Sequence, residues 1–328
     1  MAEMLGDLAL IGHVELLTPK LDASLHFFRD VMGMDVEAQQ GQSYFLRGWA
    51  DYQRYSLKLT EAEQPGIGHV GLRACSQAAL ERRVEAIKKA GLGVGWINGD
   101  HGHGPAFRFT DPDGHQMEVY YESDRYIAPE GKKPLLKNMP SHYVPRGVGV
   151  PRFDHVNMLA KDVGACRMFA TDVLGYRLHE RIISDDGSDM GAWMSLSIFS
   201  HELVYVQDRA GARGRLHHIA FYADTREEIL RAADVMLDAG IYIEAAPSKH
   251  TIAQAFFLYV IEPGGNRIEI VNGGYFVRDP DFEPVVWSEE ERRRGQAWGV
   301  HTVESFHTYG TPPLPGQKAP TFGQAAPG

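Results

Sequence analysis

The chain has 328 residues, which is long for one folded core and comfortable for two domains. Apolar residues make up 44% of the sequence and charged residues 23%, a composition that excludes a disordered chain and is typical of a globular protein. The net charge of −10 argues against a nucleic-acid partner, because such proteins gather Lys and Arg at phosphates.

The sequence shows neither an N-terminal export signal nor a cysteine motif for a metal or a disulfide. The N-terminus lacks the basic start and long apolar stretch of an export signal, and no window is apolar enough to cross a bilayer. Cys75 and Cys166 have no metal or disulfide spacing and fall in apolar patterns that predict burial. We therefore expect a cytoplasmic protein with reduced thiols, without export and without a membrane anchor.

The first half of the chain contains two similar units. The first opens on the β-rich run HVELL at His13, continues with a helical pattern and ends in further β-rich stretches. The second opens on HVGLR at His69 and closes on a β-rich run that contains Glu118. Each unit is predicted to be βαβββ, and the two together occupy roughly residues 8–122.

The second half repeats the first. HVNML at His155 and HIAFY at His218 open its two units, and Glu269 lies near the end of the last β-rich run. His13 and His155 each stand 20 residues before a Gly, and His69 and His218 each stand 22 residues before a Gly. Such internal repetition indicates duplicated structural units, which here span roughly residues 152–273.

These repeats predict an α+β fold of four βαβββ units paired into two domains. We expect an N-terminal domain over residues 1–128, a linker rich in Pro, Gly and Lys over 129–151, and a C-terminal domain over 152–308. Residues 309–328 are rich in Pro and Gly and are predicted to form a flexible tail. Residues suited to cap the four helices are Asp22, Ser76, Asp162 and Thr225.

Three residues of the second half form a candidate metal site. His155 and His218 open equivalent strands, and Glu269 lies on the last strand of the same half. Two imidazoles and one carboxylate form a facial triad, which leaves coordination positions open and suits Fe(II), although Mn(II) accepts the same ligands. Because neighbours on a strand face opposite sides, we expect His218 to be the ligand and His217 to point away.

Three further residues near this triad can move protons or donate hydrogen bonds. His201 lies in the third unit, and His250 and Tyr259 lie in the fourth, before Glu269. A His gives and takes protons near neutral pH, and a hydrogen-bonded Tyr can assist. Taken singly, each fits an ordinary loop, core or strand-edge role equally well; together they favour a catalytic site.

The motifs resemble those of a known family over nearly the whole chain, from about residue 8 to about residue 300. The chain is similar to the type I extradiol dioxygenases of the vicinal oxygen chelate superfamily, in the catechol 2,3-dioxygenase branch. One departure is Ser248, two residues before His250, where the family pattern allows a small set of residues that does not include Ser. The segment that resembles the family signature is His250-x7-Leu258-Tyr259-x2-Glu262-Pro263-x-Gly265-x3-Glu269.

The resemblance implies extradiol cleavage of a catechol by O2 at one non-haem Fe(II), in the degradation of aromatic compounds, with a 2-hydroxymuconic semialdehyde-type product. It assigns the metal to His155, His218 and Glu269. It further implies that His201 is the acid–base group and that His250 and Tyr259 bind the ring oxygens. A homotetramer is also implied by the resemblance.

Two other functions use the same scaffold: a glyoxalase-type metal isomerase and a metal-free binding module. The isomerase needs a second inward carboxylate, and the third unit offers only Glu202, which we expect to face away from His201. A binding module has no use for a metal triad and three proton-carrying groups. The dioxygenase is therefore the favoured prediction.

The first half keeps the same triad, as His13, His69 and Glu118. Counting back from the second half places Leu57 or Leu59 where His201 should be.

Two further positions bear on whether that triad works. Arg108 stands where Tyr259 should be, with a positive charge that would repel iron. His103 is the nearest candidate for a counterpart of His250. We expect a duplicated and decayed site, so that the N-terminal domain has no working centre.

The small number of Lys and Arg residues near the site narrows the class of substrate. A carboxylated ring would need an Arg beside it, whereas the approach to His250 carries only Lys249. We therefore favour uncharged, alkylated or halogenated catechols, unless Arg292–Arg294 fold over the site.

Overall fold

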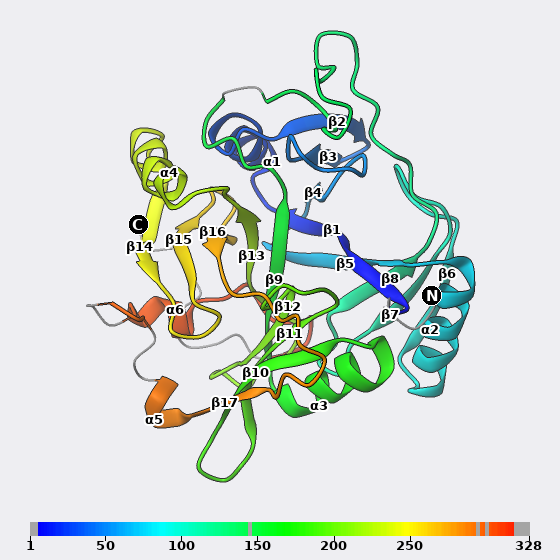
Figure 1. Cartoon of the computed structure of the whole chain (residues 1–328), viewed down its shortest axis with the longest axis vertical. Helices are drawn as coiled ribbons and strands as arrows, with labels where there is room; N and C mark the ends of the chain where they lie inside the picture. The colour runs from blue at the N-terminus through cyan, green and yellow to red at the C-terminus, as the bar shows by residue number, and fades with distance from the viewer. Residues whose placement is uncertain (1–5, 144–145, 293–295, 299–301, 318–328) are drawn as a thin grey trace.

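The computed structural model describes residues 6–143, 146–292, 296–298 and 302–317. The chain forms four consecutive βαβββ units, as predicted (Figure 1). Unit 1 contains β1 (Leu8–Thr18), α1 (Leu21–His26) continued by a π-helical turn η1 (Phe27–Val31), β2 (Asp35–Gln40), β3 (Ser43–Arg47) and β4 (Leu57–Glu61). Unit 2 contains β5 (Gly66–Ala74), α2 (Gln77–Lys89), β6 (Gly93–Ile97), β7 (Ala106–Thr110) and β8 (Gln116–Tyr120).

The second half has the same order of elements. Unit 3 contains β9 (Phe153–Ala160), α3 (Val163–Met168) continued by η2 (Phe169–Leu174), β10 (Arg177–Ile183), β11 (Asp189–Ser195) and β12 (Leu203–Gln207). Unit 4 contains β13 (Arg215–Tyr222), α4 (Arg226–Asp238), β14 (Tyr242–Lys249), β15 (Ala255–Ile261) and β16 (Arg267–Gly273). The remaining elements are β17 (Val285–Ser288), α5 (Glu289–Arg292) and α6 (Glu304–Thr308).

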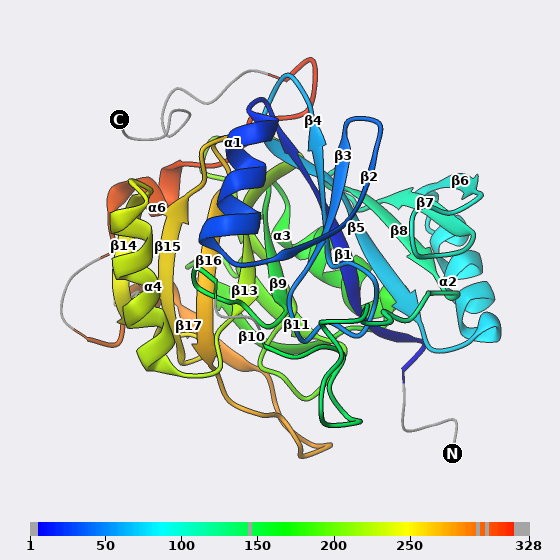
Figure 2. The same cartoon turned by 90° about the horizontal axis from the view of Figure 1, so that it is seen from above.

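Each half forms one sheet. The first has the order β2-β3-β4-β1-β5-β8-β7-β6, and the second repeats it as β10-β11-β12-β9-β13-β16-β15-β14, with β17 added beside β10. Helix α4 lies against β14–β16, and α2 lies against β8 (Figure 2). No helix among the described residues is long and apolar enough to cross a membrane.

In each half, the strand register places the first histidine of the triad and the glutamate in one row across three neighbouring strands. In the second half His155 on β9 pairs with Ala220 on β13, which pairs with Glu269 on β16. In the first half His13 pairs with Gly71, and Gly71 pairs with Glu118. The topology therefore builds two equivalent candidate sites, one in each sheet.

Helix caps follow the sequence prediction in three of four cases. Thr225 forms a capping box with Glu228, and the side chains of Ser76 and Asp162 accept backbone N–H groups at the starts of α2 and α3. The prediction for Asp22 is wrong, because α1 begins at Leu21 and Asp22 lies within its first turn.

The two halves share one hydrophobic core and exchange contacts through two equivalent turns. In the turn between β7 and β8, the carboxylate of Asp111 accepts a hydrogen bond from Tyr205 on β12, at 2.8 Å. In the turn between β15 and β16, Glu262 accepts a hydrogen bond from Ser24 on α1, at 2.6 Å. Each half is thus tied to the first unit of the other.

Two expectations differ from the structure. Tyr309 and Thr311 are buried, and Arg215 donates to the carbonyl oxygen of Thr311, so the predicted flexible tail is wrong for its first residues. Residues 318–328 of that tail lie outside the described part of the chain. Cys166 is buried as expected, whereas Cys75 is half-buried.

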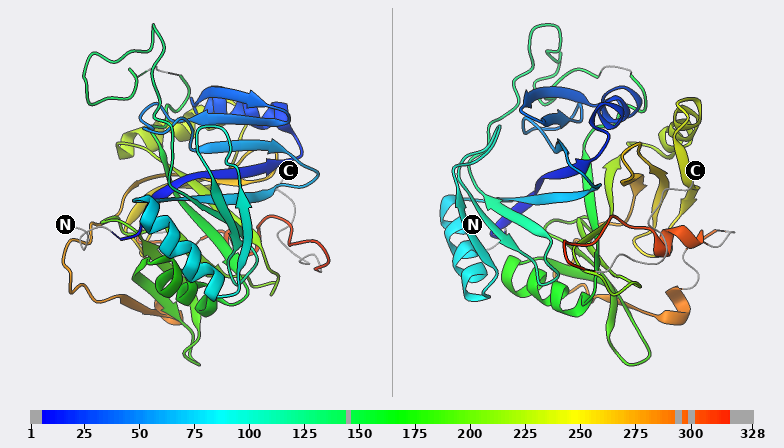
Figure 3. Two further views of the ribbon diagram at one scale, coloured as in Figure 1. Left: turned by 90° about the vertical axis from the view of Figure 1, so that its right-hand side faces the viewer. Right: turned by 180° about the vertical axis from the view of Figure 1, so that it is seen from behind.

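The segment between the halves contains no helix or strand over its described residues, 129–143 and 146–151. Its first part projects from the body of the molecule (Figure 3). The domain boundaries drawn at residues 128, 151 and 308 remain predictions.

Candidate metal centre

The three predicted ligands of the second half come together. His155 Nε2 lies 3.0 Å from His218 Nε2, and each of these atoms lies 3.0 Å from Glu269 Oε2. Adjacent ligands of an octahedral ion at about 2.1 Å are about 3.0 Å apart. All three side chains are buried, and their ligand atoms converge as a metal site requires. The donor set and its spacing therefore fit a facial triad.

The outer nitrogens of both imidazoles are held by neighbouring groups. His155 Nδ1 lies 2.8 Å from Asp154 Oδ2. His217 Nε2 donates to the carbonyl oxygen of Phe306 at 2.9 Å, which leaves His217 Nδ1 to accept from His218 Nδ1 at 2.6 Å. These contacts turn the Nε2 lone pairs of both candidate ligands inward.

The prediction that His217 points away from the site is therefore wrong. The pairing of β9 and β13 shifts between Leu216 and His218, and this irregularity interrupts the alternation of side chains. His217 and His218 consequently lie edge to face, with ring centroids 4.9 Å apart.

The charge of the triad favours a cation. Burial alone would raise the pKa of Glu269, but hydrogen bonds with His155, His218 and His250 hold it well below its usual range. Burial lowers the pKa of His218 to about 4, so this ring is neutral near pH 7. Burial would also lower the pKa of His155, yet hydrogen bonds with Asp154 and Glu269 raise it to about 9. A proton on His155 is therefore one positive partner for the buried carboxylate, and a metal ion that displaces this proton would be another.

His250 and Tyr259 form a pair beside the triad. His250 Nε2 lies 2.9 Å from the hydroxyl of Tyr259 and 3.6 Å from Glu269 Oε1. Tyr259 lies directly across from Glu269 in the pairing of β15 with β16, and the ring of His250 stacks on Phe257. The pair is therefore fixed from both sides and directed at the same centre as the triad.

His201 lies beside His155, in the loop between β11 and β12. The two ring centroids are 4.4 Å apart, and His201 Nδ1 lies 3.1 Å from Ser200 Oγ. Burial, with a smaller contribution from His155, lowers the pKa of His201 well below its usual value, so its ring is neutral near pH 7. Glu202 faces away, because its carboxylate binds Ser195 and the backbone of Leu196.

A cavity of about 110 Å³ joins these groups. The triad, His201, His250 and Tyr259 all line it, so the structure brings together every predicted site residue of the second half. Arg292 of α5 also reaches this cavity, whereas Arg293 and Arg294 lie outside the described residues. Its apolar wall includes Ile182, Trp193, Val204, Ile252 and Phe306.

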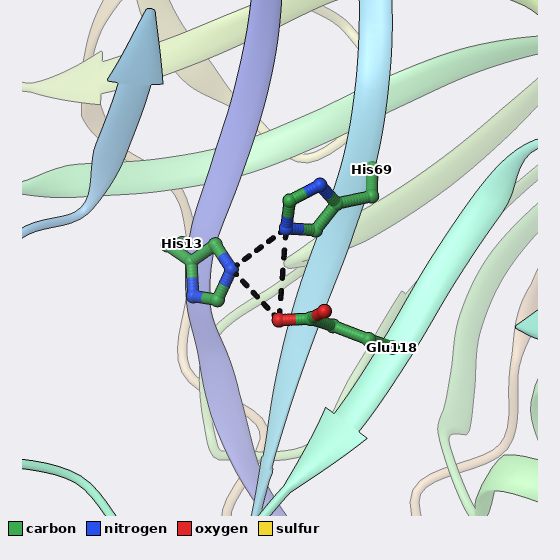
Figure 4. Close-up of side chains that lie close together, drawn as sticks. All are labelled: His13, His69 and Glu118. Carbon is green, nitrogen blue, oxygen red and sulfur yellow. Dashed lines mark hydrogen bonds and ion pairs between the residues drawn. The ribbon is translucent and has the colours of Figure 1, made fainter. Parts of the chain in front are cut away.

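The triad of the first half comes together as well. His13, His69 and Glu118 are fully buried, and their side chains converge between β1, β5 and β8 (Figure 4). The expectation that Leu57 or Leu59 occupies the position of His201 in the first half is wrong, as the strand register shows.

That correction comes from equivalent pairings in the two sheets. Leu57 pairs with Val14 as Leu203 pairs with Val156, so the position of His201 is occupied by Tyr55. The ring of Tyr55 lies against that of His13, with centroids 4.9 Å apart.

Sequence reasoning missed Asp154, His217 and Phe306, which hold the two imidazoles. For Asp154, a signal was available, because an acid directly before a candidate His ligand can orient it. Phe306 contributes its backbone from a segment 89 residues away from His217, and no local pattern predicts such a contact.

Comparison with known proteins places this geometry in a family. Residues 10–119 and 152–270 match the family described as glyoxalase/bleomycin resistance protein/dioxygenase superfamily. The chain belongs to this superfamily. Within it the chain is an extradiol dioxygenase, as its relatives indicate.

Two curated relatives align over most of this extradiol dioxygenase. A metapyrocatechase of Geobacillus stearothermophilus is 44% identical over 94% of this chain and 95% of its own length. A manganese-dependent 2,3-dihydroxybiphenyl 1,2-dioxygenase of Geobacillus genomosp. 3 is 38% identical over 90% of this chain and 95% of its own length.

Solved structures agree with the fold of this dioxygenase. The 2,3-dioxygenase LapB of Pseudomonas sp. KL28 superposes with a TM-score of 0.80 and 27% identity, over 87% of this chain and 99% of its own. Homoprotocatechuate 2,3-dioxygenase of Brevibacterium fuscum, in complex with 3,4-dihydroxyphenylacetate, gives a TM-score of 0.82 and 26% identity, with 92% of each chain covered.

Proposed function

We propose that this extradiol dioxygenase cleaves a catechol at a single Fe(II) bound by His155, His218 and Glu269. The observation that carries the proposal is the triad itself, three buried ligand atoms spaced 3.0 Å apart on residues that line a cavity. A bound Fe(II) would supply positions for both catechol oxygens and for O2, and would pass electrons between them.

The proposed roles of the surrounding residues follow from their positions. The His250–Tyr259 pair would bind and orient a ring oxygen, since both groups reach the side of the triad at Glu269. His201, which packs against His155, would accept a proton from the substrate and return it to the developing product. The apolar wall would exclude water around the ring.

Two metal ions are compatible with the ligands of this proposal. Fe(II) and Mn(II) both accept two imidazoles and a carboxylate, and one relative is named as manganese-dependent. Metal analysis of the active protein distinguishes them, and we expect iron to track activity.

We propose that the substrate is an uncharged catechol with an apolar substituent. Most of the cavity wall is apolar, but Arg292 also reaches it. An Arg beside the ring would favour a carboxylated substrate through a paired contact. The preference of the enzyme therefore depends on whether Arg292 faces the substituent.

The test is an aerobic assay after anaerobic loading with Fe(II). We expect a yellow product from catechol and from 3-methylcatechol, slower turnover of a carboxylated catechol, and at least about a 100-fold loss in Glu269→Ala. A colourless reaction with all three substrates contradicts the function, whereas a strong preference for the acid contradicts only the substrate class. The cytoplasmic location and the homotetramer remain predictions.

A further inference from the structure

The first half contains a second cluster with the geometry of a metal site. His13 Nε2 lies 3.0 Å from His69 Nε2 and 3.1 Å from Glu118 Oε1, and His69 Nε2 lies 3.6 Å from the same oxygen (Figure 4). Ligands bound at about 2.0–2.1 Å to one ion lie roughly 3.0–3.5 Å apart. The separations therefore fit a single ion placed among the three side chains.

We propose that His13, His69 and Glu118 bind a second divalent metal ion, of the zinc type, which stabilises the first half and takes no part in ring cleavage. The sequence alone favours a decayed site here, and three features of the structure favour a bound metal. This inference does not rest on the proposed catalytic role of the second half.

The first feature is the orientation of His69. Its Nδ1 lies 2.8 Å from Glu15 Oε2 and donates to that carboxylate, so its Nε2 carries the lone pair that faces His13 and Glu118. Asp154 contacts the outer nitrogen of His155 in the second half in the same way. A carboxylate behind an imidazole fixes its orientation and raises its basicity as a ligand.

The second feature is His103, whose side chain is 2% exposed. Its Nδ1 donates to the carbonyl oxygen of Gly104 at 2.9 Å, so its Nε2 carries a lone pair. That Nε2 lies 3.3 Å from Glu118 Oε1 and has no hydrogen-bond partner among the described residues. A cation beside Glu118 Oε1 would relieve the repulsion between this lone pair and the carboxylate.

The third feature is the way Arg108 meets Glu118. Arg108 Nε lies 2.7 Å from Glu118 Oε2, whereas both triad histidines converge on Oε1. Carboxylates that bind metals are themselves commonly held by a second group. Arg108 therefore orients the carboxylate and leaves one oxygen for the metal, which reverses the expectation that its charge prevents metal binding.

Aromatic and imidazole rings pack closely around His13 in this cluster. Tyr55, His103 and Tyr120 pack around His13, with ring centroids 4.9, 5.2 and 5.5 Å away. Arg108 pairs with Glu118 across the strands as Tyr259 pairs with Glu269, so the hydroxyl of the second half has no counterpart. A site closed by side chains and built from imidazole and carboxylate is suited to a structural Zn²⁺.

The experiment is a count of metals in the full chain, purified from medium that contains iron, manganese and zinc. We expect two metal ions per chain in the parent, one in Glu118→Gln, one in Glu269→Gln and none in the double variant. The exposed Glu63 provides the matched control, and Glu63→Gln should keep two. Glu118→Gln should melt at a lower temperature and keep ring-cleaving activity within about threefold.

An unchanged metal count in Glu118→Gln overturns the proposal, whether the parent binds one ion or two. If Glu118→Gln does not fold, anomalous scattering from crystals of the parent decides. A peak among His13, His69 and Glu118 supports the second ion, and a peak confined to the second half contradicts it. Failure of the catalytic proposal is separate, because it shows in the metal and activity of Glu269→Gln.

Discussion

His217 and His218 are neighbours in sequence whose Nδ1 atoms meet at 2.6 Å, so that one candidate ligand is oriented by the residue before it. His217 is itself held by the carbonyl oxygen of Phe306. A phenylalanine at position 217 cannot accept from His218 Nδ1. We expect His217→Phe to bind Fe(II) about 10- to 100-fold more weakly, measured by competition with a chelator.

The half-buried His142 of the linker gives the control, since His142→Phe should keep the affinity of the parent. Equal affinity in His217→Phe and the parent would show that His218 needs no support from His217.

His201 packs against His155 without replacing it in the triad, which predicts a loss of turnover without a loss of metal. We expect His201→Phe to keep one ion at His155 and His218 and to turn over catechol at least about 100-fold more slowly, because an acid–base group is removed. Single-turnover kinetics with saturating O2 measure this effect. Unchanged turnover removes His201 from the mechanism.

Tyr259→Phe should be less damaging than His201→Phe. The change deletes the hydroxyl that lies 2.9 Å from His250 and leaves both rings in place. One hydrogen bond contributes about 1 kcal/mol, so we expect roughly a five- to tenfold loss in kcat/KM with full metal content. Tyr222→Phe is the control, and loss of metal in Tyr259→Phe would mean that the hydroxyl supports the triad itself.

The buried pair of Asp111 and His115 at the boundary between the halves predicts a pH dependence of stability. His115 Nδ1 lies 2.7 Å from Asp111 Oδ2. Burial alone would raise the pKa of Asp111, but the charge of His115 lowers it below 3.8. Burial alone would lower the pKa of His115, but the charge of Asp111 raises it above 6.5.

The sign of each contribution follows from these directions. The contribution of Asp111 is complete above pH 3.8 and is lost as the pH falls through its folded pKa. That of His115 is complete below pH 6.5 and is lost as the pH rises through its folded pKa. We expect Asp111→Asn to lower the free energy of unfolding by about 3 kcal/mol near pH 5, and by less as the pH rises above 6.5 and through the folded pKa of His115.

Urea unfolding of the parent and of Asp111→Asn across this range measures the difference. A difference that stays constant as the pH rises from about 5 into the alkaline range contradicts a charged pair and indicates a neutral hydrogen bond.

The repeat pattern made the fold and the second-half triad predictable. Duplicated spacing fixed His155 and His218 on equivalent strands, and the last strand supplied Glu269. Prediction failed where the strands depart from regular geometry. Because the register shifts before His218, the side chains of His217 and His218 do not alternate between the two faces of the sheet as we expected.

Loop length explains the error in the first half. His13 stands 44 residues before the start of β4 at Leu57, whereas His155 stands 48 residues before the start of β12 at Leu203. Counting from the ligand therefore overshot Tyr55 by four residues. Only the pairing of the strands, which a single sequence does not display, corrects such a count.

Through the turns at Asp111 and Glu262, each half binds the other as one subunit of a dimer binds its partner. The molecule is in this sense an internal dimer, and in the proposed function the second half carries the reaction while the first half supplies a complementary surface. Selection on the first half then acts through shape and rigidity. Under the proposed function, a substitution in the first half would reduce catalysis by altering this surface, although it lies outside the cavity of the second half.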